Sequence, residues 1–270
     1  MRNRIYCYMP ILIITSVIIC FSGCEEKKPE LPPKYEGWES YSYKHFVYHF
    51  HPDNFWGRNI DRFSTAFERY LEEDCEFLAM EIPTDTIHFY IHTDMNSGVE
   101  LTGRDLPYHT DNQIHWGRQS PFGLELARYL INKIDMRMTD YKVLYDGLAT
   151  LLDYSNKDYH RQTASLTELK RYIPLDTLID NDAYGRANER ERVWEAASLV
   201  AYIKYHYGIN RFKLLWQSTS SFEQSVQDLF QVDMLTFEKE WNEFTRQYFD
   251  GLNIQDIPVK EVLGQDSTKQ

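Results

Sequence analysis

Residues 120–150 contain the feature that most restricts the fold, a helix that is apolar on nearly every side. Pro121 suits the first turn of such a helix, because a proline there removes an N–H that would have no partner. A helix without a broad polar face is stable only inside a protein. The segment therefore predicts a buried central helix, with apolar side chains at Leu124, Leu126, Ala127, Leu130, Ile131 and Ile134.

Two charged residues, Glu125 and Arg128, interrupt this apolar helix. They are three positions apart, so their side chains share one side of the helix and can form an ion pair. A second motif follows at residues 145–149, which read Tyr-Asp-Gly-Leu-Ala and include Asp146. We expect Arg128 to pair with Glu125 or with Asp146; the alternative is that Glu125 and Arg128 face solvent.

Together these motifs resemble the metal site of the peptidase-MA-like family, zinc metallopeptidases of the gluzincin type. In that family, two histidines of a His-Glu-x-x-His helix bind zinc and the glutamate is the general base. A Glu-Gly-Leu-Ala segment supplies the third ligand. Here Leu124 and Arg128 stand at the histidine positions around Glu125, and Asp146 stands at the third. The resemblance implies a degenerate member of the family.

The resemblance extends over about residues 43–249. A strand–helix–strand arrangement precedes the central helix, a Tyr-Gly pair occurs at Tyr207, and a Phe-Glu-x-x-Trp motif occupies residues 237–241. The family implies an α+β fold, with a small N-terminal sheet and one long helix followed by a mostly helical, zincin-like body. We expect this domain to span residues 38–250.

The residues at the former ligand positions are unsuited to zinc, which takes N, S or O ligands. Leu124 has no lone pair, and Arg128 is a permanent cation without an acceptor atom. Without metal, Glu125 has no acidified water to activate. We therefore expect no bound metal, no cofactor and no catalytic residue.

An alternative is a metal site displaced to other histidines, with Glu125 still acting as the base. His109 and His115 precede the central helix, and histidines at even spacing on a strand share one face. Under this alternative the chain is an active hydrolase that binds zinc. The further candidate ligands are the histidines of the predicted strands, His45, His49, His51, His88 and His92.

The first residues resemble a bacterial lipoprotein signal. Arg2 and Arg4 precede a short apolar run at residues 11–21, and residues 21–24 read Phe-Ser-Gly-Cys. The run is too short for a comfortable membrane span. We expect Cys24 to carry lipid after removal of residues 1–23, and an ordinary cleaved signal or an uncleaved anchor is the alternative. Glu25 after the cysteine favours the outer membrane or cell surface over the inner membrane.

Beyond the signal, residues 24–37 are charged and proline-rich and predict a flexible tether. Residues 251–270 form a polar tail, which we expect to be disordered. The pattern predicts strands at residues 44–50, 86–92 and 113–116. It predicts helices at residues 58–80, 144–154, 190–207, 211–217, 222–230 and 235–249.

Residues 160–188 are polar and predict a long loop with one helical turn at residues 166–172. Gly208 is expected to end the preceding helix. Cys75 is the one thiol left beyond the signal and lipid sites, so no internal disulfide is possible and we expect it to be buried. The net charge of −12 argues against nucleic acid as a partner.

These features predict a lipid-anchored, catalytically inactive, metallopeptidase-like protein of the bacterial cell envelope. We expect a peptide, a glycan or an envelope protein to bind in the former substrate cleft. A purely structural role, with side chains such as Leu124 and Arg128 filling the cleft, is the alternative for an inactive protein. An open, polar-lined cleft would favour binding over a structural role.

Overall fold

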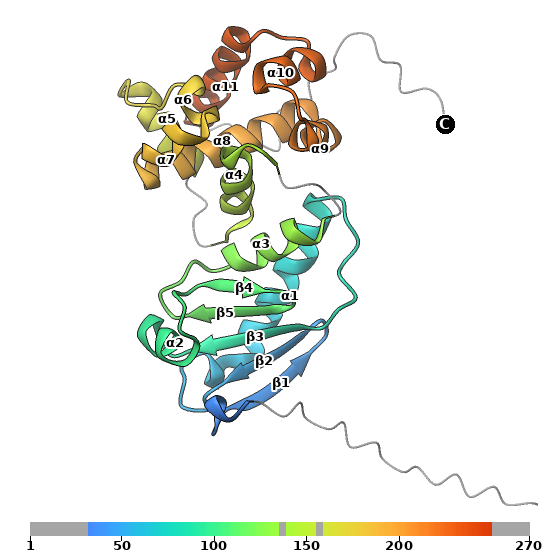
Figure 1. Cartoon of the computed structure of the whole chain (residues 1–270), viewed down its shortest axis with the longest axis vertical. Helices are drawn as coiled ribbons and strands as arrows, with labels where there is room; N and C mark the ends of the chain where they lie inside the picture. The colour runs from blue at the N-terminus through green and yellow to red at the C-terminus, as the bar shows by residue number, and fades with distance from the viewer. Residues whose placement is uncertain (1–31, 135–138, 155–158, 250–270) are drawn as a thin grey trace, which may run out of the picture.

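The structure, a computed structural model, describes residues 32–134, 139–154 and 159–249. It has the predicted α+β fold, a five-stranded sheet near the N-terminus followed by a mostly helical body (Figure 1). The predicted signal, the lipid site at Cys24 and the tail at residues 251–270 lie outside the described residues. Within the described part of the chain, no helix is both long enough and apolar enough to cross a membrane.

The sheet has the strand order β1-β2-β3-β5-β4. Strands β2, β3 and β5 are parallel at its centre, and β1 and β4 pair antiparallel at its edges. The three central strands confirm the predictions, whereas the edge strands were not predicted because they contain few aliphatic residues. The strands are β1 (Glu39–Tyr43), β2 (Phe46–Phe50), β3 (Ile87–His92), β4 (Tyr108–Thr110) and β5 (Gln113–Gly117).

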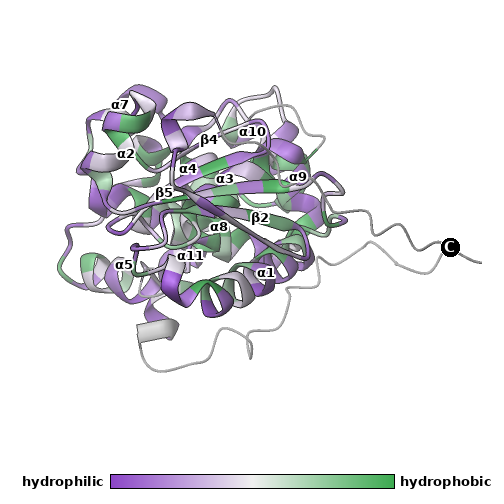
Figure 2. Cartoon of the chain, turned by 90° about the horizontal axis from the view of Figure 1, so that it is seen from below, coloured by the Kyte–Doolittle hydropathy of each residue, from purple (hydrophilic) through white to green (hydrophobic). Residues whose placement is uncertain are grey.

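One face of the sheet packs on the long helix α1 (Ile60–Phe77). Phe67 of α1 contacts Phe89 of β3 with ring centroids 4.6 Å apart, and Phe63 adds a further aromatic contact to the same ring. Figure 2 shows hydrophilic and hydrophobic residues in turn along α1, as expected for a helix with one buried side. Cys75 is buried in this layer, as predicted.

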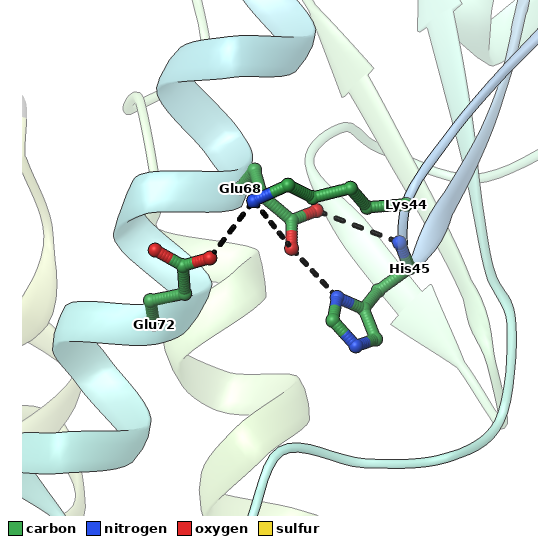
Figure 3. Close-up of polar contacts among 4 residues, drawn as sticks. All are labelled: Lys44, His45, Glu68 and Glu72. Atoms are coloured by element: carbon green, nitrogen blue, oxygen red, sulfur yellow. Dashed lines mark hydrogen bonds and ion pairs between the residues drawn. The ribbon is translucent and has the colours of Figure 1, made fainter.

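An ion-pair cluster joins α1 to the turn between β1 and β2 (Figure 3). The carboxylate of Glu68 is buried and lies 2.6 Å from Nδ1 of His45, while Lys44 pairs with Glu72 at 3.0 Å. His45 thus lies in the turn before β2 and binds a helix residue. It does not share a strand face with His49, which corrects the expectation that alternate histidines would converge here.

The helical body is built around α4 (Lys142–Leu152) and the largely buried α8 (Glu189–Tyr207). The two helices are in close contact at Gly147, where an added Cβ would lie 2.4 Å from the carbonyl oxygen of Ala196. The glycine of the Asp-Gly-Leu-Ala motif is therefore required by helix packing. Leu148 and Ala149, which complete the motif, are buried.

The prediction of a long loop at residues 160–188 is wrong. This segment is mostly helical, because a few apolar side chains in each short helix are buried, Leu166, Leu178 and Tyr184 among them. Asp180 caps the third helix by accepting hydrogen bonds from two backbone N–H groups. The helices are α5 (Tyr159–Glu168), α6 (Leu175–Ile179) and α7 (Asn181–Arg186).

Three further helices complete the body, α9 (Ile209–Gln217), α10 (Phe222–Phe230) and α11 (Met234–Phe249). Phe237 and Trp241 of α11 are buried, and the indole N–H of Trp241 donates to Ser198 at 3.2 Å. Glu238 accepts a hydrogen bond from the backbone N–H of Leu175 at the start of α6. The Phe-Glu-x-x-Trp motif thus fixes α11 to α8 and α6.

Two boundaries differ from the prediction. The central helix α3 (Leu124–Lys133) begins at Leu124 and not at Pro121, since Gly123 has a φ of +129° that no helix accommodates. The tether was predicted to reach residue 37, but Tyr35 is buried and its ring lies 5.1 Å from that of Tyr90. The helix α2 (Met95–Thr102) was not predicted. An Asp94–Ser97 capping box stabilises its N-terminus.

Candidate functional site

A cleft of about 890 Å³ opens between α3, α4 and the start of α8. Leu124 and Arg128, one turn apart on α3, form one wall, and Asp146 of α4 forms the next. The structure thus places three of the four residues that the resemblance singles out around one cavity. The cleft is open and has a largely polar lining, which is the condition that favours binding over a collapsed structural core.

The remaining lining residues come from three places. Thr150 and Asp153 continue the α4 wall, residues 119–121 contribute the loop before α3, and residues 188–190, 192 and 193 contribute the start of α8. The charged residues on the walls are three arginines and three carboxylates, so their formal charges cancel. They are Arg128, Arg190, Arg192, Asp146, Asp153 and Glu189.

Glu125, the fourth residue, does not line this cleft. Its side chain is only 3% exposed, and both carboxylate oxygens are engaged. Oε1 accepts a hydrogen bond from Nη1 of Arg128 at 2.6 Å, and Oε2 lies 2.8 Å from Nδ1 of His109. Nε2 of His109 in turn lies 2.7 Å from the side-chain amide of Asn132. The Glu125 carboxylate is thus buried and held between the side chains of Arg128 and His109.

The predicted ion pair of Arg128 is therefore with Glu125, and Arg128 forms no ion pair with Asp146. Nε of Arg128 is buried without a hydrogen-bond partner. Among Leu124, Glu125, Arg128 and Asp146, only Asp146 both lines the cleft and has an oxygen that could bind a metal. A catalytic zinc requires about three protein ligands, so these residues do not fit the metal.

The histidines do not converge on an alternative metal site. His109 pairs in register with Ile114, which faces the core, whereas His115 pairs with Tyr108 on the opposite face of the sheet. His109 and His115 therefore point away from each other. Among the described residues, no group of three or more His, Cys, Asp or Glu side chains is placed to hold a metal ion.

The strand histidines instead form pairs on the sheet face opposite α1. Nε2 of His49 lies 3.0 Å from Nδ1 of His88, and Nε2 of His92 lies 3.2 Å from Nδ1 of His115. Burial lowers the pKa of His49 and of His92 to about 4, and that of His115 to about 3. These rings are neutral packing groups near pH 7.

The charges at the start of α8 were missed from the sequence. Asn188 caps the helix by accepting a hydrogen bond from the backbone N–H of Glu191 at 3.1 Å. Nη1 of Arg192 donates to the carbonyl oxygens of Tyr184 and Gly185 at the end of α7, which fixes the guanidinium at the cleft. The available signal was a charged first turn on a helix that is otherwise buried.

No protein-family model matches the chain, and no curated protein matches its sequence. The assignment of the site therefore depends on the geometry of the cleft and on the chemistry of its lining residues.

Proposed function

We propose that this chain is a lipid-anchored, non-catalytic binding protein of the bacterial cell envelope, with a scaffold of the gluzincin type. The cleft between α3, α4 and α8 is its binding site. The observation that carries the proposal is that Leu124, Arg128 and Asp146 border one open cavity while Glu125 is turned away from it. The scaffold keeps a cleft and lacks the groups for zinc hydrolysis.

The chemistry of the three positions supports a binding role. A general base must reach the proton that it removes, directly or through one water. Glu125 is buried and both of its oxygens are occupied by Arg128 and His109. Neither Leu124 nor Arg128 can coordinate a metal that would acidify a water. Binding requires none of these functions.

The cavity volume of about 890 Å³ is within the range of roughly 300–1,000 Å³ that is typical of ligand sites. Charged groups of both signs line the cleft together with the apolar side chains of Pro121, Leu124 and Val193. Such a lining complements a short peptide segment better than a glycan, which offers hydroxyl groups and few charges. The ligand is therefore a peptide, free or as part of an envelope protein or polymer.

In this proposal a lipid on Cys24 anchors the chain to the membrane. The net negative charge of the chain argues against nucleic acid as a partner. Several acyl chains bury enough CH₂ groups for stable attachment. Glu25 after the lipid-bearing cysteine favours the outer membrane or the cell surface. Mass spectrometry of the chain purified from bacterial membranes tests the anchor, and an unmodified Cys24 thiol would contradict it.

A second candidate function is a metal-dependent peptidase with Glu125 as the base. It is favoured by the position of His109, a candidate metal ligand, beside Glu125, and it would require the two side chains to exchange their 2.8 Å contact for a metal ion. Elemental analysis of the purified chain, before and after incubation with zinc, separates the two. If the chain only binds a ligand, the purified protein should contain far less than one equivalent of transition metal and should cleave no member of a peptide library. Stoichiometric zinc that a chelator removes, with chelator-sensitive cleavage, would establish the peptidase.

A further inference from the structure

Two arginines that line the cleft, Arg128 on α3 and Arg192 on α8, are each anchored through one nitrogen. Arg128 is anchored through Nη1 to Glu125, and Arg192 is anchored through Nη1 to two backbone carbonyl oxygens. Nε of each guanidinium is buried and has no hydrogen-bond partner among the described residues, and the guanidinium of Arg192 also lies over the ring of Tyr184, 5.0 Å from its centroid. Anchoring through Nη1 thus fixes each side chain and leaves its Nε–H without an acceptor.

Nε–H lies on the side of the guanidinium that binds oxyanions. Nε–H and Nη2–H are parallel and match the two oxygens of a carboxylate, which gives a bidentate and charge-assisted pair. A buried donor without a partner costs free energy, about 1–3 kcal/mol. An anionic group bound in the cleft would supply the missing acceptors to Arg128 and Arg192.

The carboxylates of the cleft argue against a ligand that is purely anionic. Asp146 and Asp153 line the same cavity as the two arginines, so the inner walls carry no net charge. The hydroxyl of Tyr184 has a pKa raised by burial, and next by its closeness to Asp146, while Arg192 lowers it. The guanidinium of Arg192 lies 5.0 Å from the centroid of the Tyr184 ring, and Asp146 and Arg192 line the same cleft from α4 and α8.

We propose that the cleft recognises an amino acid or a short peptide with both ends free, with a carboxylate bound by Arg128 and Arg192 and an ammonium bound by Asp146. This inference rests on the proposed binding function and adds the class of ligand. The presence of both arginines and carboxylates in one cleft then favours ligands that carry both charges over ligands that carry one.

Titration calorimetry of the full chain in non-ionic detergent tests this inference. The probes are tetra-alanine with free ends, its C-terminal amide, its N-acetyl form, the doubly blocked form, and inorganic phosphate. We expect the free peptide to bind and amidation to weaken binding by about tenfold or more. Phosphate should bind more weakly than the free peptide, because it lacks the ammonium group.

Variants assign the effect to residues. Arg192→Lys keeps the charge and can still donate to the α7 carbonyl oxygens, but it lacks the bidentate edge. The substitution should weaken binding of the free peptide and leave binding of the C-terminal amide unchanged. In Asp146→Asn, the free peptide and its N-acetyl form should bind with the same affinity, because the carboxylate that binds the ammonium is gone. Arg161→Gln, at an exposed position on α5, removes a charge away from the cleft and should change nothing.

The outcomes separate this inference from the proposed function. If all four peptides bind equally, the cleft is a peptide site that does not read the termini, and the inference is overturned while the proposed function stands. If phosphate alone binds, the cleft holds a simple anion site and the inference is also overturned. If no probe binds, a peptide-binding role for the cleft fails together with the inference.

Discussion

Arg128 and Glu125 form an ion pair across one turn of α3, with Nη1 of the arginine 2.6 Å from Oε1 of the glutamate. The arginine side chain is one-third exposed, at 33%, and the glutamate is 3% exposed, so the pair joins the cleft to the interior. His109 occupies the other oxygen of the carboxylate. A zinc-binding helix has no such internal pair, because its ligands face the metal. The charged residues of α3 therefore have a structural role as well as a place at the cleft.

Arg128→Leu should destabilise the protein by about 1–3 kcal/mol, since it leaves one oxygen of a buried carboxylate without a partner. Chemical denaturation measures the change in the free energy of unfolding. The matched control is Arg69→Leu, because Arg69 forms an exposed pair with Glu73 on α1 at 3.6 Å. That variant should change stability by less than about 0.5 kcal/mol. Equal effects of the two substitutions would show that the buried pair contributes nothing.

Gly147→Ala should destabilise by about 1–3 kcal/mol, because the new methyl group would lie 2.4 Å from the carbonyl oxygen of Ala196 and force α4 away from α8. Gly185→Ala is the control, since nothing lies within 4 Å of the added carbon there. It should be neutral or stabilising by up to about 1 kcal/mol. Thermal unfolding of both variants checks the prediction, and an unchanged midpoint for Gly147→Ala would contradict the close packing of α4 on α8.

The histidine pairs predict a loss of stability in acid. Burial lowers the pKa of His49 and His92 from 6.5 to about 4 and that of His115 to about 3, so the unfolded chain binds more protons. Their contribution is present above pH 6.5 and is lost as the pH falls toward 4. His88 has a pKa lowered by burial in the same direction.

His115→Gln should flatten this dependence when the free energy of unfolding is measured by urea denaturation between pH 7.5 and 4.5. His51→Gln is the control, because the His51 side chain is 43% exposed. Its stability should follow that of the original chain across the range. If His115→Gln kept the full acid dependence, neutral packing of this ring would be wrong.

Glu195 predicts the opposite trend. Burial raises its pKa from 4.5 to about 8, and the side chain accepts the backbone N–H of Ile173. The folded chain holds this proton, so stability falls as the pH rises from about 4.5 to 8. Glu195→Gln keeps a carbonyl acceptor and removes the charge. Its thermal midpoint should exceed that of the original chain increasingly from pH 5 to pH 8, whereas Glu100→Gln on the exposed side of α2 should show no such trend.

The sequence indicated the parts of the fold that follow from strong local patterns. Alternation identified the central strands, and helical spacing identified α1, α8, α10 and α11 within a few residues. The charged pair on α3 was also predicted, because residues three apart on a helix are neighbours. The segment at residues 160–188 was not, since its three short helices are stabilised by contacts with other helices and by caps.

The sequence by itself determined the types of residue at the cleft, which include a leucine and an arginine where the resemblance expects metal ligands. Only the tertiary structure decided their use. It turned Glu125 away toward His109, placed His109 and His115 on opposite faces of the sheet, and brought Arg192 of α8 to the same cleft as Arg128. These arrangements depend on contacts between residues far apart in the chain, and such contacts leave no periodic pattern in the sequence.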